Sequence, residues 1–167
     1  MSRNLNNLHP KVKEATLLLI EKCKKEKNIE IIVTQTTRSE AEQQAFYSRG
    51  RLGLNDVNVL YKKAGLAPIT AAENKSRVTN AKSVRNSFHA YGVAVDFAVM
   101  INGKTALWDS DKDLDGDGIA EYKEVGIMAE SLGFEWGGRW SSIADAPHIQ
   151  MRFGLSIEDY QAGKRPK

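Results

Sequence analysis

Helical spacing of apolar residues marks two segments of the chain. In residues 10–27 and 121–132, apolar side chains recur every three or four positions, which predicts amphipathic helices. The apolar positions are Val12, Ala15, Leu19 and Cys23 in the first segment and Val125, Met128, Ala129 and Leu132 in the second. A third helix is expected from Ser39 to about Arg49, because Ser39 and Glu42 have the spacing of a capping box.

Alternating or β-branched runs predict three strands. Residues 29–36 are rich in β-branched side chains, and residues 91–99 and 147–153 alternate with a period of two. The expected core-facing residues are Val93, Val95, Phe97 and Val99 in the second strand and Ile149, Met151 and Phe153 in the third, and the opposite faces carry Asp96 in the second and His148, Gln150 and Arg152 in the third. The Asp96 carboxylate therefore stands among small residues.

The stretch from residue 50 to residue 86 follows neither pattern. Only a short helix near residues 56–64 is expected, and the rest is interrupted by Gly50, Gly53, Gly65 and Pro68. A segment of this length either covers a substrate-binding cleft or is an insertion without a role. The sequence leaves both readings open.

Length and composition indicate one ordinary globular domain over residues 1–167. Hydrophobic residues make up 41% and charged residues 27%, which excludes a wholly disordered or collagen-like chain. The single cysteine, Cys23, excludes a disulfide framework, and three histidines limit the ligands of any transition-metal site. A net charge of +3, from 24 basic and 21 acidic residues, is too small to indicate nucleic-acid binding.

The N-terminal residues, MSRNLNNLHP, are polar and have no signal-peptide core. No segment approaches the roughly 20 apolar residues of a membrane span. We therefore expect a chain made in the cytoplasm, without membrane insertion. A target outside the membrane would require release through a separate pore protein.

Two short segments contain histidines and aspartates that are candidates for a functional site. His89 and Asp96 are seven residues apart, so a continuous strand would place them on opposite faces. They can converge only if the chain turns between them, and Gly92 permits such a turn. Asp145 precedes His148 by three residues at the entry to the third strand.

Catalytic zinc requires three protein ligands and one open position for water. Two imidazoles and a carboxylate from His89, Asp96 and His148 would fill these roles and leave Asp145 as a general base. Arg38, at a strand-to-helix corner, could stabilise an oxyanion or bind a substrate carboxylate. A single histidine is more often structural than a ligand, so spacing alone leaves the structural reading open.

The segment SFHAYGVAVD (residues 87–96) matches the S-x-H-x-x-G-x-A-x-D signature of the zinc peptidases that include D-Ala-D-Ala carboxypeptidases, D-Ala-D-Ala dipeptidases and L-alanyl-D-glutamate endopeptidases. DAPH (145–148) resembles the closing acid-x-x-His element of that family. Three further segments resemble phage endolysins and wall peptidases of the L-alanyl-D-glutamate group: TQTTRSEAEQQAFYSRGR (34–51), VTNAK (78–82) and GFEWGGRWSSIADAPH (133–148). The resemblance covers roughly residues 30–153.

This resemblance implies an α+β fold with a small, mainly antiparallel sheet and flanking helices, as in the Hedgehog and D-Ala-D-Ala peptidase group. The roles that it implies are zinc binding by His89, Asp96 and His148, base catalysis by Asp145, and substrate binding by the positively charged Arg38. Ser87 either contacts substrate or is structural. Trp136 and Trp140 either line the cleft or pack in the core.

The implied function is a zinc-dependent endopeptidase that hydrolyses the L-Ala–D-Glu bond of peptidoglycan stem peptides. A compact, monomeric chain without a wall-binding domain resembles a phage endolysin for host lysis. The alternatives are a D-Ala-D-Ala carboxypeptidase or dipeptidase on the same metal, and a non-catalytic, metal-stabilised wall-binding module. Asp145 argues against the binding module, which needs no base, and against the dipeptidases, which usually have Glu in the closing element.

One departure from the family pattern concerns residues 51–77. This stretch is longer than the resemblance leads us to expect between the G-R and V-T-N-A-K elements. A different substrate fit could follow, so the wall chemotype that is cut stays open.

A second metal site is indicated by an acidic loop. Residues 113–124 satisfy the calcium-loop pattern D-x-D-x-D-G-x5-E, whose hard oxygens suit Ca²⁺. The expected ligands are Asp113, Asp115, Asp117, Ile119 and Glu124. The alternative is an acidic turn that stabilises the next helix through its dipole. Sequence does not separate a structural ion from a regulatory one.

Overall fold

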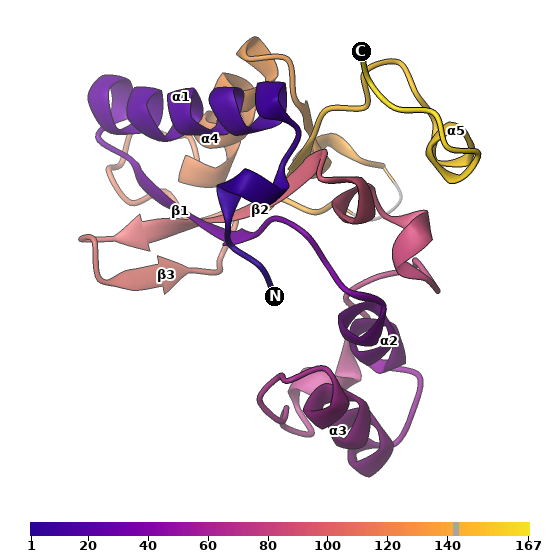
Figure 1. The fold of residues 1–167 in the computed structure, drawn as a ribbon. Coiled ribbons are helices and arrows are strands. Elements are labelled where there is room, and N and C mark those ends of the chain that lie inside the picture. Colours follow the sequence, from indigo (N-terminus) through magenta and orange to yellow (C-terminus); the bar gives the residue numbers. More distant parts are fainter. Residues whose placement is uncertain (142–143) are drawn as a thin grey trace.

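The computed structural model describes residues 1–141 and 144–167 and contains one five-stranded sheet (Figure 1). The strands are β1 (Glu30–Gln35), β2 (Ala94–Ile101), β3 (Thr105–Leu107), β4 (Glu135–Trp136) and β5 (His148–Gln150). Neighbouring strands pair antiparallel in the order β1-β2-β5-β4, and β3 pairs with the second half of β2. The predicted α+β class with a small antiparallel sheet is confirmed.

Two helices, α1 (Pro10–Lys27) and α4 (Glu121–Ser131), lie side by side against the sheet (Figure 1). The others are α2 (Glu40–Ser48), α3 (Leu54–Lys63) and α5 (Ile157–Gln161). The predicted helices over 10–27, 39–49 and 121–132 are confirmed, and the capping box of Ser39 and Glu42 is formed. Within the described residues, no helix has the length and apolar character needed to cross a membrane.

The main core lies between the sheet and the α1–α4 pair. The predicted inward face of β2 and the residue before it is confirmed, because Val93, Val95, Phe97 and Val99 are at most 1% exposed. Ala94 and Ala98, on the opposite face, are also fully buried. Asp96 is therefore the one residue from Gly92 to Val99 that keeps partial exposure.

Two strand boundaries differ from the sequence-based prediction. Strand β2 begins at Ala94 and not at Tyr91, because Phe88–Tyr91 form a 3-10 turn. Strand β5 ends at Gln150, since Phe153 (φ 54°) and Gly154 (φ 73°) then turn the chain. Left-handed φ values at consecutive residues are incompatible with a continuing strand.

Residues 50–86 fold back onto α2 and form a second, smaller core with it. Val57 and Tyr61 of α3 pack there against Ala45 of α2. After α3 the chain returns beside α2, where the Gln43 amide donates to the Ala81 carbonyl at 2.6 Å. This return brings residues 78–81 to the rim of the cavity described below.

Candidate active site

Three predicted metal ligands come together where β2 and β5 pair. Asp96 and His148 are directly opposite in the antiparallel register, so their side chains leave the sheet on one face. His89 comes from the Phe88–Tyr91 turn, and its Nε2 lies 3.2 Å from Asp96 Oδ1. His148 Nδ1 lies 2.9 Å from the same oxygen. The turn thus overcomes the seven-residue separation of His89 and Asp96.

Gly92 makes this turn possible, as the sequence predicted. Its φ is 67°, in the left-handed region that favours glycine. A Cβ at this position would also lie 2.6 Å from the carbonyl oxygen of Asn7. Any other residue would therefore displace either the turn or the N-terminal segment packed against it.

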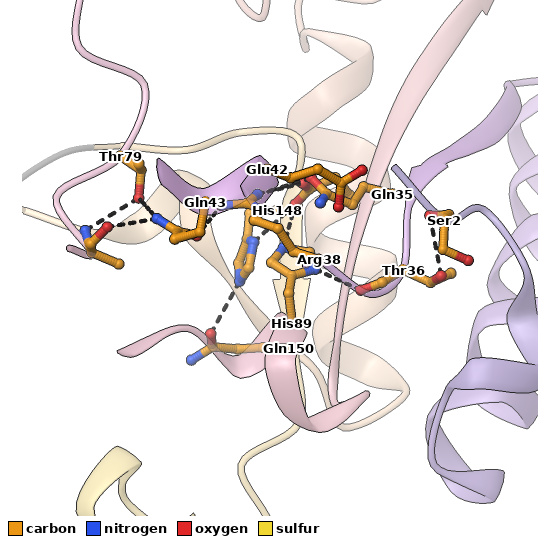
Figure 2. Close-up of polar contacts among 12 residues, drawn as sticks. Ser2, Gln35, Thr36, Arg38, Glu42, Gln43, Thr79, His89, His148 and Gln150 are labelled. Atoms are coloured by element: carbon orange, nitrogen blue, oxygen red, sulfur yellow. Dashed lines mark hydrogen bonds and ion pairs between the residues drawn. The ribbon is translucent and has the colours of Figure 1, made fainter. Parts of the chain in front are cut away.

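The second nitrogen of each histidine faces an oxygen acceptor (Figure 2). His89 Nδ1 is 2.7 Å from the Thr36 carbonyl oxygen, and His148 Nε2 is 3.0 Å from Gln150 Oε1. Because both partners accept, these nitrogens carry the ring hydrogens in the neutral histidines. The lone pairs of His89 Nε2 and His148 Nδ1 are then directed at Asp96.

This donor set fits zinc. Two unprotonated imidazole nitrogens and a carboxylate oxygen, all acceptors, lie within 4.8 Å of one another. Without a cation, such lone pairs repel one another unless a proton lies between them. A zinc ion takes this combination of ligands, and the outer hydrogen bonds of both histidines hold the rings in place for it.

The pKa values of Asp96 and His148 are shifted because these groups lie so close together. Burial alone raises the pKa of Asp96, but the two histidines outweigh it and hold that pKa well below its ordinary value. Burial lowers the pKa of His148, but the hydrogen bond to Asp96 and the negative charges of Asp96 and Asp145 together raise it overall. The site therefore favours the ionised form of the Asp96 carboxyl, which attracts positive charge.

The predicted base, Asp145, is held beside these ligands by the backbone. Its N–H donates to the Gly137 carbonyl at 3.0 Å, and its own carbonyl accepts from His148 N–H at 3.0 Å. A Cβ on Gly137 would lie 2.5 Å from the Asp145 carbonyl oxygen, so this close approach requires glycine. Burial raises the pKa of Asp145, and the charge of Asp96 adds to the rise.

The two tryptophans of the 133–148 segment have separate places. Trp136 is a core residue, 8% exposed, and its indole N–H donates to the Ala146 carbonyl at 2.8 Å. It thereby anchors the loop that carries Asp145. Trp140 lines the cavity, with its ring centroid 5.1 Å from that of His148. Ser142 and Ile143 of this segment lie outside the described residues.

Arg38 is fixed by two glutamines that the sequence-based prediction did not single out. Its Nη1 donates to Gln43 Oε1 at 3.0 Å and its Nη2 to Gln35 Oε1 at 2.8 Å (Figure 2). Nη2 also lies 3.8 Å from Asp96 Oδ2. Burial lowers the pKa of the guanidinium, and the nearby carboxylates oppose that change. A fixed positive charge thus faces the cavity.

A cavity of about 280 Å³ joins these groups. Its lining includes Arg38, Ser87, Asp96, Trp140, Asp145 and His148. The structure therefore places Ser87 at the cavity wall, next to the turn that carries His89. The returning segment after α3 contributes Val78, Thr79 and Ala81.

The residues that orient the ligands, Thr36 and Gln150, were also not assigned a role from sequence. The alternation of residues 147–153 puts Gln150 on the same polar face as His148, and the sequence holds no other signal for its role. Thr36 acts through its backbone carbonyl, which no side-chain pattern reports. Its position is in turn fixed by the Ser2 carbonyl, which accepts from Thr36 N–H at 2.8 Å.

The acidic loop forms a compact carboxylate cluster of its own. Oxygens of Asp113, Asp115 and Asp117 lie within 4.8 Å of one another. Backbone N–H groups hold the carboxylates: Gly118 donates to Asp113 at 2.9 Å, and Ile119 donates to Asp117 at 2.8 Å. Hydrogen bonds from the loop amides, chiefly those of Gly118 and Gly116, lower the pKa of Asp113.

Glu124, the predicted last ligand, lies apart from this three-aspartate cluster. It is buried in α4 and pairs with Lys27 Nζ of α1 at 2.7 Å. The nearby Glu121 instead contacts the loop, because its Oε1 accepts from Leu114 N–H at 2.7 Å. Of the five predicted calcium ligands, the described structure brings three together by their side chains, Asp113, Asp115 and Asp117. Ile119 follows them in the same loop, and Glu124 pairs with Lys27 instead.

Comparisons with known proteins identify relatives of this chain. A family model of the M15 peptidases, described as D-alanyl-D-alanine carboxypeptidase, matches residues 80–151. The peptidoglycan L-alanyl-D-glutamate endopeptidase CwlK of Bacillus subtilis (strain 168) is 32% identical over 146 residues, which cover 87% of this chain and 74% of CwlK.

Two further relatives extend the comparison. The L-alanyl-D-glutamate peptidase of Listeria phage A118 is 29% identical over 161 residues, and this chain spans 44% of its length. The crystal structure of the L-Ala D-Glu endopeptidase ChiX of Serratia marcescens matches with a TM-score of 0.55 at 21% identity, covering 94% of this chain and 86% of ChiX. That match shows the shared fold. The identity to CwlK and the match to the family model show that this chain belongs to the M15 family of metallopeptidases.

Proposed function

We propose that this protein is a zinc-dependent endopeptidase that hydrolyses the L-Ala–D-Glu bond of peptidoglycan stem peptides. The observation that carries the proposal is the meeting of His89 Nε2 and His148 Nδ1 at Asp96, beside the buried Asp145. The bond is taken from CwlK and the Listeria phage peptidase, both named for it.

In this proposal His89, Asp96 and His148 hold the zinc ion. When bound, zinc supplies a Lewis acid that polarises a carbonyl group and acidifies water. Asp145 accepts a proton from the attacking water and delivers it to the amine of the departing D-Glu residue. Its raised pKa suits the first step, because a more basic carboxylate takes the proton more readily.

Arg38 supplies the positive charge opposite Asp145. Its guanidinium is clamped by Gln35 and Gln43 before substrate arrives, so little reorganisation is needed during the reaction. It can stabilise the oxyanion that develops on the L-Ala carbonyl, or bind the free carboxylate of D-Glu. Ser87, at the cavity wall, is proposed as a further substrate contact.

The second candidate is a D-Ala-D-Ala carboxypeptidase or dipeptidase, which the description of the matching family model favours. A non-catalytic wall-binding module has less support, because it would not need a buried carboxylate at the ligands. Substrate cleavage separates these readings.

Zinc-loaded protein is incubated with purified peptidoglycan, and the new chain ends are identified by mass spectrometry. New amino-terminal glutamate is expected. Released D-alanine or D-Ala-D-Ala would instead assign the carboxypeptidase or dipeptidase activity. No cleavage by protein that holds zinc would overturn the enzyme proposal.

For its biological setting, we propose a phage endolysin that is made in the host cytoplasm, acts as a monomer and reaches the wall through a separate pore protein. The relative from Listeria phage A118 supports this setting. Expression of the protein in the cytoplasm of a host should be harmless until a membrane pore is co-expressed. Lysis without the pore would contradict the proposed route.

We also propose that the acidic loop binds one Ca²⁺. Support comes from three carboxylates held by loop amides and from Gly116 and Gly118, whose left-handed φ values of 81° and 88° close the loop. Glu124 would join only after leaving Lys27. Calorimetric titration should give one site, lost in the double variant Asp113→Ala, Asp115→Ala. Equal heats for both proteins would refute the site.

A further inference from the structure

The active-site cavity does not end at the metal ligands. A second hollow, also of about 280 Å³, shares Arg38, Val78, Asp96 and Asp145 with the first. The two hollows therefore adjoin at the reacting groups. We call this second hollow the Trp108 arm, because Trp108 is one of its walls, and the first hollow the Ser87 arm.

Trp108 is unusual in its surroundings. It is 68% exposed, more than any other large hydrophobic residue of the described structure, and it directly follows β3. The backbone beneath it is fixed, since Leu107 is buried and its carbonyl accepts from Tyr122 Oη at 2.7 Å. An indole on an anchored backbone beside a catalytic cleft is a preformed flat surface for a ligand.

The two arms differ in character. Met1, Phe46 and Pro147 accompany Trp108 in its arm, beside the polar Thr34, Gln35 and Arg49. Thr79, Asn86 and Gln150 accompany Ser87 in the other, beside Phe88 and Trp140. The Trp108 arm nevertheless exposes mostly apolar surface, whereas the Ser87 arm exposes slightly more polar than apolar surface.

The two sides of an L-Ala–D-Glu bond differ in the same way. On the amino side, the alanine methyl group, a lactyl group and the C–H faces of a muramic acid ring follow one another. On the carboxyl side the stem carries carboxylates and amides. Resting on the proposed function, we infer that the Trp108 arm binds the sugar-bearing side of the substrate, with the N-acetylmuramic acid ring stacked on Trp108.

The test compares two substrates for the zinc-loaded protein. One is the disaccharide-linked tetrapeptide, and the other is the same tetrapeptide with an acetyl group in place of the sugar. Trp108→Ala should lower kcat/KM about five- to tenfold on the first, the factor expected for losing one aromatic stacking contact. It should leave kcat/KM on the acetyl peptide unchanged. Trp108→Phe should recover most of the loss.

A matched control is Ile127→Ala, which removes another exposed hydrophobic side chain, 44% exposed, from α4. It should not change kcat/KM on either substrate. An equal loss on both substrates in Trp108→Ala, or no loss on either, would overturn the inference.

A binding measurement keeps this inference separate from the proposed function. N-acetylmuramyl-L-alanine, the sugar-side product, is titrated into wild-type protein and Trp108→Ala by NMR. Weaker binding to the variant is expected. Equal binding, or none to wild type, would overturn the sugar subsite even if the bond is cut. If neither substrate is cut at L-Ala–D-Glu, the proposed function fails and this titration still decides the subsite.

Discussion

At the scale of single residues, the two histidines of the site are held in different ways. The acceptor for His89 is a backbone carbonyl, that of Thr36. The acceptor for His148 is the Gln150 side chain, whose amide is itself oriented by a hydrogen bond to Glu135 at 3.1 Å. Only the second arrangement can be removed by substituting one side chain.

Gln150→Leu should therefore weaken zinc binding. Without the acceptor, His148 is free to rotate and to place its hydrogen on Nδ1, the nitrogen proposed to bind zinc. A loss of about 10- to 100-fold in zinc affinity is expected for such an outer partner. Chelator competition measures this loss. Unchanged affinity in Gln150→Leu would show that packing alone orients the ring.

Asp145→Asn should separate catalysis from metal binding. Zinc content, measured by elemental analysis, should stay stoichiometric, because Asp145 is not a proposed ligand. The kcat should fall by about 10²- to 10⁴-fold, as expected for loss of a general base. Near-normal turnover in the variant would show that another group is the base.

The same variant has a predicted effect on stability in metal-free protein. The pKa of Asp145 is raised by burial, so the folded state binds its proton more tightly than the unfolded state does. Wild type therefore loses stability as the pH rises through this raised pKa. Metal-free Asp145→Asn should be more stable than wild type at pH 7, and the difference should vanish below the ordinary carboxyl pKa. A difference independent of pH would contradict the assignment.

At the scale of elements, Trp136 joins α4 to the loop that carries the base. Its ring lies against the backbone of Gly126 in α4 and of Gly138, so closely that a Cβ on either glycine would overlap it. Helix, strand and loop are therefore packed through one indole. The Trp136 N–H then fixes the Ala146 carbonyl.

Gly126→Ala tests this packing. Helix propensity alone would make the substitution stabilising by about 1 kcal/mol. We expect the opposite sign, a loss of about 1–3 kcal/mol, because the new methyl group overlaps the Trp136 ring. Urea denaturation measures the change, with the exposed Ser131→Ala of the same helix as a control. A more stable Gly126→Ala protein would show that the ring moves aside freely.

Elements with a local signal were predictable from sequence. The helices over 10–27 and 121–132 follow from apolar spacing, and α2 follows from its capping box. Strands β3 and β4 have only three and two residues, too few for a periodic pattern. The early end of β5 depends on the left-handed backbone conformation of Phe153. The sequence does not indicate this conformation, because it is uncommon for residues other than glycine.

The residues of the site also differ in whether a local sequence signal predicts them. The motifs predict that His89, Asp96, Asp145 and His148 lie in one cluster, and Gly92 marks the turn between the first two. Gln150 as the partner of His148, and Gln35 and Gln43 as partners of Arg38, depend on which strands pair and on where α2 packs. Those long-range relations carry no local signature.

At the scale of the whole molecule, the proposed zinc ligands tie distant parts of the chain together. They come from the turn before β2, from β2 itself and from β5, and Thr36 adds the end of β1 through its bond to His89. A bound ion would thus cross-link most of the sheet. Ligand binding to the folded state alone raises its stability in proportion to the logarithm of ligand concentration.

Removing zinc with a chelator should lower the Tm by about 10 °C, if free zinc had been about 1,000-fold above its Kd. The His148→Ala protein should show no zinc-dependent change in Tm. The Asp113→Ala, Asp115→Ala protein should show the full change, since its loop is a separate site. Scanning calorimetry with and without chelator makes the comparison. A chelator-insensitive wild type would contradict the structural role of the ion.

The two joined hollows bear on the mechanics of the bacterial wall. A pocket closed at one end accepts only a chain terminus, so an enzyme with such a pocket cleaves only near the ends of a peptide. The depression found here has two hollows that meet at Asp96, so it offers room for a substrate that continues beyond the reacting groups. Under the proposed function, each cut would release one stem peptide from its glycan strand. The peptidoglycan network would fail under turgor pressure once enough stem peptides are released.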